Sequence, residues 1–262
     1  MNRSCLGLLI ASVTLNSIAG TGLLISTSAA SLPENLEVTL QEISQIADAN
    51  WGIAVIEFKT GEEISSNADR QFMMQIPHFP LAAMLIELSN AGEISLNGFI
   101  SRGEYYWERL HWAQQGGRGM CMAVIWTIGF GRINEWLAEK GFAGTEIRGV
   151  AQDVPNAPVY DPNYISAKDA LEYLKIIYSN LDQASVRNIG TNPPLSDFNR
   201  ETLGFKNTIY GWVDISEDSK LLFLIIDQPV DSDLGIVLLA DDINDPAEVD
   251  QGLRILYEAL TD

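Results

Sequence analysis

The sequence offers three candidate residues for nucleophilic catalysis: His78, Cys121 and Lys206. A histidine can act as a general base near neutral pH because its ordinary pKa is about 6.5. A cysteine can attack an acyl carbon, and a lysine can anchor a negatively charged group. The competing interpretation is structural, because His78 stands between proline and phenylalanine, and Cys121 lies in an apolar run typical of a core.

Metal chemistry is less well supported by the residue types. The chain has 2 histidines, His78 and His111, which are too few for a three-histidine zinc site. Oxygen ligands for calcium occur at Asp241, Asp242 and Asn244, but the stretch lacks the glycine and the final glutamate of an EF-hand loop. A solvated turn is therefore favoured there, and we expect neither a metal ion nor a cofactor.

Length and charge narrow the class of protein. The 262 residues suffice for one large domain, and a hydrophobic share of 47% is ordinary for a globular chain. The formal charge is −19, from 35 acidic and 16 basic residues. This balance argues against binding to nucleic acid or to an anionic membrane face, because both depend on clustered Lys and Arg.

The N-terminal residues 1–30 have the pattern of a signal peptide. Arg3 is their one charged residue, an apolar stretch covers 5–25, and small residues stand at 28–30. Cleavage there predicts a secreted protein, periplasmic or extracellular, with no membrane span. The alternative is an uncleaved transmembrane anchor, since about 20 apolar residues can cross a bilayer. After cleavage only Cys121 remains, so no intramolecular disulfide is possible.

Apolar periodicity predicts the elements that must position these side chains. Helices are expected at 33–50, 81–91, 133–140, 166–178 and 246–260. Strands are expected at 51–58, 63–67, 209–215, 220–227 and 235–240. Gly92 is expected as a left-handed helix cap, and Ser166 as an N-cap with Asp169 three residues on. Residues 98–119 fit no regular pattern, and 148–164 and 190–200 are typical of loops.

The order of these elements predicts an α+β fold. The late strands are expected to join the early ones in one antiparallel sheet, because isolated hairpins are marginally stable. N- and C-terminal helices flank this sheet, and the helical middle of the chain forms a second lobe. We expect a single domain at 31–262, with a sheet lobe at 31–72 and 200–262 and a helical lobe at 73–199.

Several stretches resemble the penicillin-recognising serine hydrolases, which include class A β-lactamases and D-Ala-D-Ala peptidases. The stretches lie at 52–63, 67–72, 80–96, 131–137 and 161–171. The resemblance covers most of 40–258 and implies the two-lobed β-lactamase or transpeptidase fold. It also implies acyl transfer to a serine, provided that the catalytic motifs are present.

The family's nucleophile motif, Ser-x-x-Lys, is absent from this chain. Aligned on Pro80, the serine position is Gln75 and the lysine position is His78. Aligned on Phe72, the two positions become Ile76 and Phe79. Neither register supplies a hydroxyl group. Pro77 also lacks an amide hydrogen, in a turn whose amides help to form the family's oxyanion hole.

The remaining motifs are degenerate as well. No Ser-Asp-Asn or Tyr-x-Asn triplet occurs at 115–122, where the second motif is expected. The best match to Lys-Thr-Gly, on the strand that pairs with substrate, keeps Lys206 but has Thr208 in place of the glycine. At the position of the class A glutamate that activates water stands Gln152, with Asp153 beside it.

The motif losses favour a secreted, catalytically silent protein of this fold. It would bind an unknown small molecule, peptide or glycan between its lobes, or an envelope protein. The alternative is a hydrolase with substituted residues: His78 as base, Lys206 as anchor, and Cys121 or a nearby serine as nucleophile. A third hypothesis places an interaction patch outside the cleft, on aromatic residues for which filling the core of the helical lobe is the favoured role: Tyr105, Tyr106, Trp107, Trp112 and Trp126.

Overall fold

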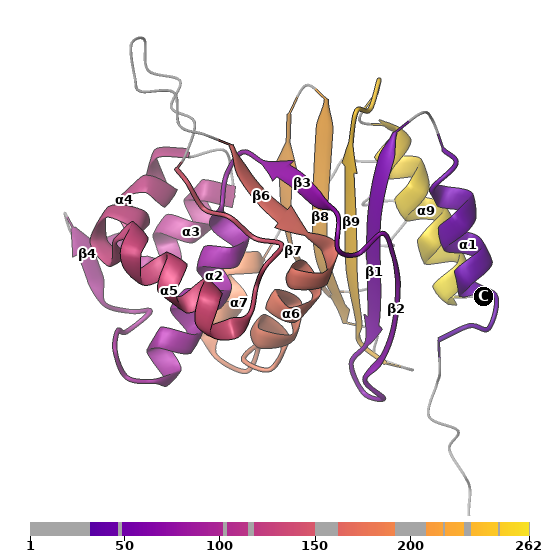
Figure 1. Ribbon diagram of the computed structural model, residues 1–262. Helices are drawn as coiled ribbons and strands as arrows, with labels where there is room; N and C mark the ends of the chain where they lie inside the picture. Colours follow the sequence, from indigo (N-terminus) through magenta and orange to yellow (C-terminus); the bar gives the residue numbers. More distant parts are fainter. Residues whose placement is uncertain are drawn as a thin grey trace, which may run out of the picture.

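The computed structural model describes most of the chain after the N-terminal segment (Figure 1). The described residues are 32–46, 49–101, 104–114, 118–149, 162–191, 208–216, 218–227, 232–245 and 247–261. They form an antiparallel sheet with a pair of helices on one face and a helical lobe on the other side. The expected α+β arrangement is confirmed. Within this part of the chain no helix is long and apolar enough to cross a membrane.

The main sheet joins early and late parts of the chain, as the sequence predicts. Its five strands have the order β2-β1-β9-β8-β7, with every neighbouring pair antiparallel. The strands are β1 Asn50–Glu57, β2 Glu62–Ser66, β7 Thr208–Ile215, β8 Ser219–Asp227 and β9 Leu234–Asp241. Because β8 and β9 are buried on both faces, they appear in the sequence as continuous apolar runs.

Two terminal helices cover one face of the sheet. Helix α1 (Leu36–Ile43) packs against α9 (Ala247–Thr261), and the two lie side by side in Figure 1. The expected helix at 33–50 is too long, because the chain turns after Ile43 although its apolar spacing continues. The turn lets the carbonyl oxygen of Ile46 accept the indole N–H of Trp51 at 3.1 Å.

The helical lobe lies on the other side of the sheet. Its helices are α2 His78–Asn90, α3 Tyr106–Gln114, α4 Arg118–Ile128, α5 Phe130–Lys140, α6 Ala167–Tyr178 and α7 Ala184–Gly190. The predicted caps are confirmed: Ser166 Oγ accepts the N–H of Asp169 at 3.2 Å, and Gly92 has a φ of +76°. The sequence did not predict helices α3, α4 and α7, and α3 lies within 98–119, where no regular pattern was found. Two short strand pairs were also missed: β3 Gln71–Met74 with β6 Asn163–Ser166, and β4 Phe99–Ser101 with β5 Glu104–Tyr105.

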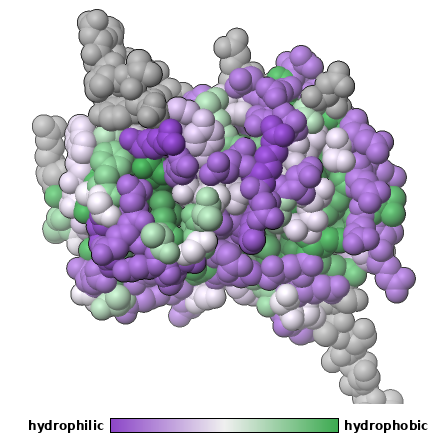
Figure 2. Space-filling view, viewed as in Figure 1, coloured by the Kyte–Doolittle hydropathy of each residue, from purple (hydrophilic) through white to green (hydrophobic). Residues whose placement is uncertain are grey.

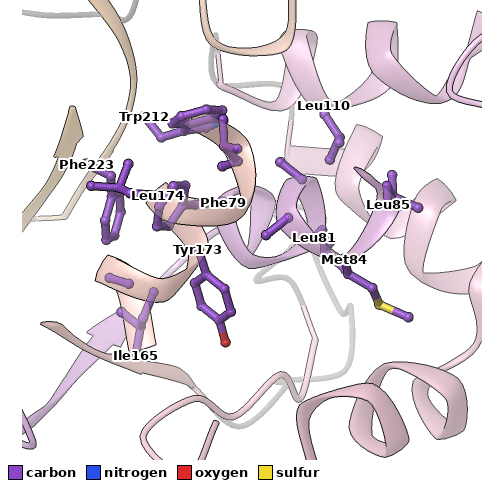
Figure 3. Close-up of a cluster of buried hydrophobic side chains, with 14 of the residues drawn as sticks. Phe79, Leu81, Met84, Leu85, Leu110, Ile165, Tyr173, Leu174, Trp212 and Phe223 are labelled. Atoms are coloured by element: carbon purple, nitrogen blue, oxygen red, sulfur yellow. The ribbon is translucent and has the colours of Figure 1, made fainter. Parts of the chain in front are cut away.

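An aromatic cluster fixes α2 against the sheet and α6 (Figure 3). The ring of Phe79 stacks on Phe223 of β8 with centroids 4.1 Å apart, and it lies 5.1 Å from the ring of Trp212 on β7. The ring of Tyr173 on α6 meets Phe79 edge-on at 5.8 Å. All four side chains are buried, so the position of the start of α2 is set by packing on three elements.

Candidate functional site

The turn before α2 is held by a carboxylate from the sheet. Oδ2 of Asp214 accepts the backbone N–H of Gln75 at 2.5 Å and that of Ile76 at 3.3 Å. Asp214 is 5% exposed, and the bond from Ile76 is buried while the bond from Gln75 is partly buried. A buried carboxylate that accepts backbone N–H groups forms strong, charge-assisted bonds. Asp214 therefore fixes both the geometry and the charge of this turn.

The alternation of β7 explains how Asp214 reaches the turn. Trp212 belongs to the core on the helical-lobe side, whereas Val213 belongs to the core under α1 and α9. Side chains two residues apart share a face of a strand, so Asp214 points to the same side as Trp212. Since Trp212 packs against Phe79 near the start of α2, the carboxylate two residues on lies beside the turn that precedes this helix.

His78, the first residue of α2, is neutral and enclosed. It is 1% exposed, and its Nδ1 lies 2.8 Å from the carbonyl oxygen of Ile76. A carbonyl is only an acceptor, so Nδ1 carries the proton, and Nε2 finds no hydrogen-bond partner among the described residues. Burial lowers the pKa of His78 to about 4. Such a side chain stays unprotonated at pH 7 but is a weak base.

The thiol of Cys121 on α4 is also enclosed. It is fully buried, and burial together with the negative charge of Asp214 raises its pKa far above the ordinary range. The thiolate is the reactive form of cysteine, and this environment disfavours it. The structure thus brings His78, Cys121 and Asp214 into one region, but in protonation states that suit packing rather than nucleophilic attack.

The other residues singled out from the motifs are distributed differently. Lys206, Gln152 and Asp153 lie outside the described residues. Thr208 begins β7, at the opposite end of the strand from Asp214. Of the motif positions, therefore, Gln75, Ile76 and His78 are the ones that the described structure brings together, around a carboxylate that the motifs did not indicate.

Asn163 ties two segments to this turn. Its Oδ1 accepts the N–H groups of Arg148 at 2.8 Å and Gly149 at 3.1 Å. Its Nδ2 donates to the carbonyl oxygens of Gly149 at 2.7 Å and Met74 at 3.3 Å. A single buried amide thus links the residues just before 150 to the end of β3. The sequence showed Asn163 only as part of a loop, because its partners are all backbone atoms.

The outer edge of β7 is partly occupied by the chain itself. On one side β7 pairs with β8, and on its other side Tyr210 forms an antiparallel bridge with Thr191, which follows α7. In the family that the sequence resembles, the corresponding strand pairs with the substrate backbone. Here Thr191 takes the pairing position at Tyr210.

No metal site is evident among the described residues, where no group of three or more His, Cys, Asp or Glu side chains is placed to hold an ion. At the acidic stretch, Asn50 Nδ2 donates to Asp241 at 2.9 Å and to Asp242 at 2.6 Å. Arg70 also pairs with Asp241 at 3.1 Å. These carboxylates are engaged by amide and guanidinium donors.

Burial of neutral His78 should make folding stability depend on pH. The folded-state pKa of about 4 lies below the ordinary 6.5, so between these values the unfolded chain binds a proton that the folded chain does not. Stability should therefore fall as the pH drops from 6.5 to 4, by about 3 kcal/mol from this group, and level off below pH 4. Urea unfolding at several pH values measures this fall.

A His78→Leu variant provides the control, because it removes the titrating group while an apolar side chain still occupies the buried space. The difference in unfolding free energy between wild type and variant should change in this pH window and be flat above pH 7.5. A difference that stays constant from pH 7.5 to 4 would show that His78 is not buried in the neutral form.

Comparison with known proteins gives a likeness in structure alone. No protein-family model and no curated protein matches the sequence. Among solved structures, a β-lactamase from Chitinophaga pinensis matches with a TM-score of 0.71 and 18% identity, over 85% of this chain and 97% of that one. A β-lactamase from Xanthomonas campestris matches with a TM-score of 0.68 and 16% identity, over 86% and 95% of the two chains.

A reconstructed protein agrees with these. The ancestral class A β-lactamase of Gram-negative bacteria matches with a TM-score of 0.70 and 15% identity, over 86% of this chain and 99% of the other. Identities this low carry the architecture and not the activity. The resemblance found in the sequence is confirmed at that level: the chain has the class A β-lactamase-like fold.

Proposed function

We propose that this chain is a catalytically silent binding protein built on the β-lactamase-like fold. The observation that carries the proposal is the carboxylate of Asp214 on the backbone N–H groups of Gln75 and Ile76. These amides lie in the turn where the family has its nucleophile. Acyl transfer needs N–H groups that are available to a developing oxyanion. In this chain Oδ2 of Asp214 already accepts them.

The missing nucleophile and the engaged oxyanion donors are two separate arguments against acyl transfer by this chain. Removing a single oxyanion donor from a serine hydrolase costs about 10²–10³ in rate. Here two amides are engaged, neither sequence register supplies a serine, and the buried His78 and Cys121 are poor substitutes. The substituted-residue hydrolase is therefore the weaker hypothesis.

The proposed ligand is a small molecule, peptide or glycan bound between the lobes, or an envelope protein. Secretion to the periplasm or the extracellular space remains part of the proposal, and it is supported by the signal-peptide pattern of residues 1–30.

Covalent labelling tests the proposal. Purified protein is incubated with a fluorescent penicillin, and its intact mass is measured, with a known penicillin-binding protein labelled in parallel and circular dichroism to verify folding. We expect no adduct on this chain. An added mass equal to the penicillin would contradict the proposal, and peptide mapping would then identify the nucleophile.

A further inference from the structure

The helical lobe carries three exposed aromatic side chains. Phe99 on β4, Trp112 on α3 and Trp126 on α4 are 63%, 57% and 67% exposed. The aromatic residues noted in the sequence thus divide into two groups, because Tyr106 is buried in the core whereas Trp112 and Trp126 face solvent. Exposed tryptophans are costly to solvate and are enriched where proteins bind partners.

The exposed rings belong to adjoining elements. Helices α3 and α4 lie side by side, with Arg109 Nη1 2.8 Å from Met120 Sδ, and β4 packs against α4. The ring of Phe99 stacks on Tyr105 with centroids 4.6 Å apart. Figure 1 places β4 and α4 together at the end of the lobe far from α1 and α9, and Figure 2 shows green and pale residues mixed with purple ones there. We call this surface the α4 face.

Helix α4 carries no acidic residue in a strongly acidic protein. No Asp or Glu occurs between Glu108 and Glu135, although the chain has 35 acidic residues. After Arg118, its first residue, α4 has outward residues that are uncharged and exposed or partly exposed: Gly119, Met120, Ala123, Trp126 and Thr127. Two arginines of neighbouring helices are paired with carboxylates, Arg109 with Glu104 and Arg132 with Glu93.

We propose that the α4 face joins two copies of this chain in a two-fold dimer. The charge distribution carries the argument. A chain of net charge −19 repels its own copies, so self-association has to use a surface that lacks acidic groups. A two-fold axis brings the same patch of both copies together, and an aromatic patch without acidic groups can pack against its own copy.

The same observations disfavour an anionic membrane as the occupant. Binding to anionic headgroups depends on available Lys or Arg side chains, each contributing about 1 kcal/mol. Arg109 and Arg132 already have carboxylate partners, so Arg118 is the one basic residue that α4 itself offers, and the net charge of the chain opposes approach to such a surface. Helix α4 has 11 residues and is therefore about 16 Å long, so an interface built on it is small. We therefore expect a dimer of micromolar affinity.

Sedimentation velocity of the purified protein, over a concentration series in 0.05 M and 0.5 M NaCl, tests the proposal. We expect a monomer–dimer equilibrium that tightens in high salt, because salt screens the repulsion between acidic copies. Trp126→Glu places a like charge on both sides of the interface and should weaken the dimer by at least about tenfold. Val38→Glu is the matched control on α1, where Val38 is 56% exposed, and it should leave the dimer unchanged.

Three outcomes would overturn the proposal. One is a protein that stays monomeric across the whole series. Another is a dimer that Trp126→Glu and Val38→Glu weaken equally. The third is a monomer that cosediments with phosphatidylglycerol vesicles through Trp126, since the α4 face would then be a membrane contact. Circular dichroism of both variants shows whether the fold is kept.

Discussion

Replacement of Asp214 by alanine should destabilise the protein by about 3–5 kcal/mol, because two interior N–H groups lose a charged acceptor and each such bond contributes about 1.5–3 kcal/mol. Oδ2 of Asp214 accepts both Gln75 N–H and Ile76 N–H, and the shortened side chain leaves no atom in reach. A domain has only about 5–15 kcal/mol of stability, so the urea midpoint should fall markedly.

Two control variants separate this effect from a general loss of negative charge. Asp214→Asn keeps one oxygen acceptor in the same place and should cost about 1–2 kcal/mol, since a neutral acceptor forms a weaker bond than a charged one. Asp69→Ala removes a carboxylate whose side chain is 85% exposed, and such surface ion pairs contribute at most about 1 kcal/mol. An Asp214→Ala variant as stable as Asp69→Ala would contradict the role assigned to this carboxylate.

Neither Asp214 variant should restore acylation. Asp214→Ala makes the amides of Gln75 and Ile76 available, but the turn still lacks a hydroxyl group and a lysine on the following helical turn. We therefore expect penicillin labelling of Asp214→Ala to be negative, as we expect for the wild type. Labelling that appears in this variant would show that the carboxylate alone suppresses a surviving activity.

The sheet could be predicted from the sequence because its signals are local. Strands β8 and β9 are apolar runs of 9 and 8 residues bounded by polar turns, and this short length favours strands over helices. The cap of α6 was predictable for the same reason, since Ser166 and Asp169 are three residues apart. By contrast, β3 and β6 have four residues each, too few to show a period, and they pair across the whole helical lobe.

The site could be predicted only in part. Comparison with the family's motifs located the turn at Gln75 and Ile76, because the stretches on both sides of it, 67–72 and 80–96, resemble the family. It did not indicate Asp214, which lies 139 positions from Gln75 and binds backbone atoms that no sequence pattern marks. A single acid within the apolar alternation of 209–215 was the one available signal, and it is equally typical of a solvent-facing strand position.

Burial determines the protonation states of His78 and Cys121, and the sequence does not show which residues are buried in this way. From the sequence alone, both residues are compatible with catalysis. Their reactivity depends on their protonation state, and the protonation state depends on access of solvent to the side chain. Helix packing encloses both side chains and shifts each toward its neutral form. Enclosure of this kind results from contacts between α2, α4 and the sheet, so no local window of sequence contains it.

Replacement of Lys220 by alanine should cost about 3–5 kcal/mol, because it breaks a buried ion pair and leaves a carboxylate in the core without its ammonium partner. Lys220 Nζ on β8 pairs with Asp250 Oδ1 on α9, and the two side chains are 5% and 12% exposed. The pair lies on the sheet face covered by α1 and α9, away from the candidate site. Urea unfolding measures the loss.

The double variant Lys220→Met with Asp250→Leu gives the sharper test, because apolar residues of similar volume remove both charges together. Well-packed replacements of a buried pair are commonly neutral or stabilising by about 1–4 kcal/mol, so the double variant should be more stable than Lys220→Ala. The exposed pair Lys168–Asp69, with side chains 66% and 85% exposed, is the matched control, and Lys168→Ala should cost at most about 1 kcal/mol. If Lys220→Ala costs no more than Lys168→Ala, water reaches the pair between β8 and α9, and this part of the core is looser than its burial indicates.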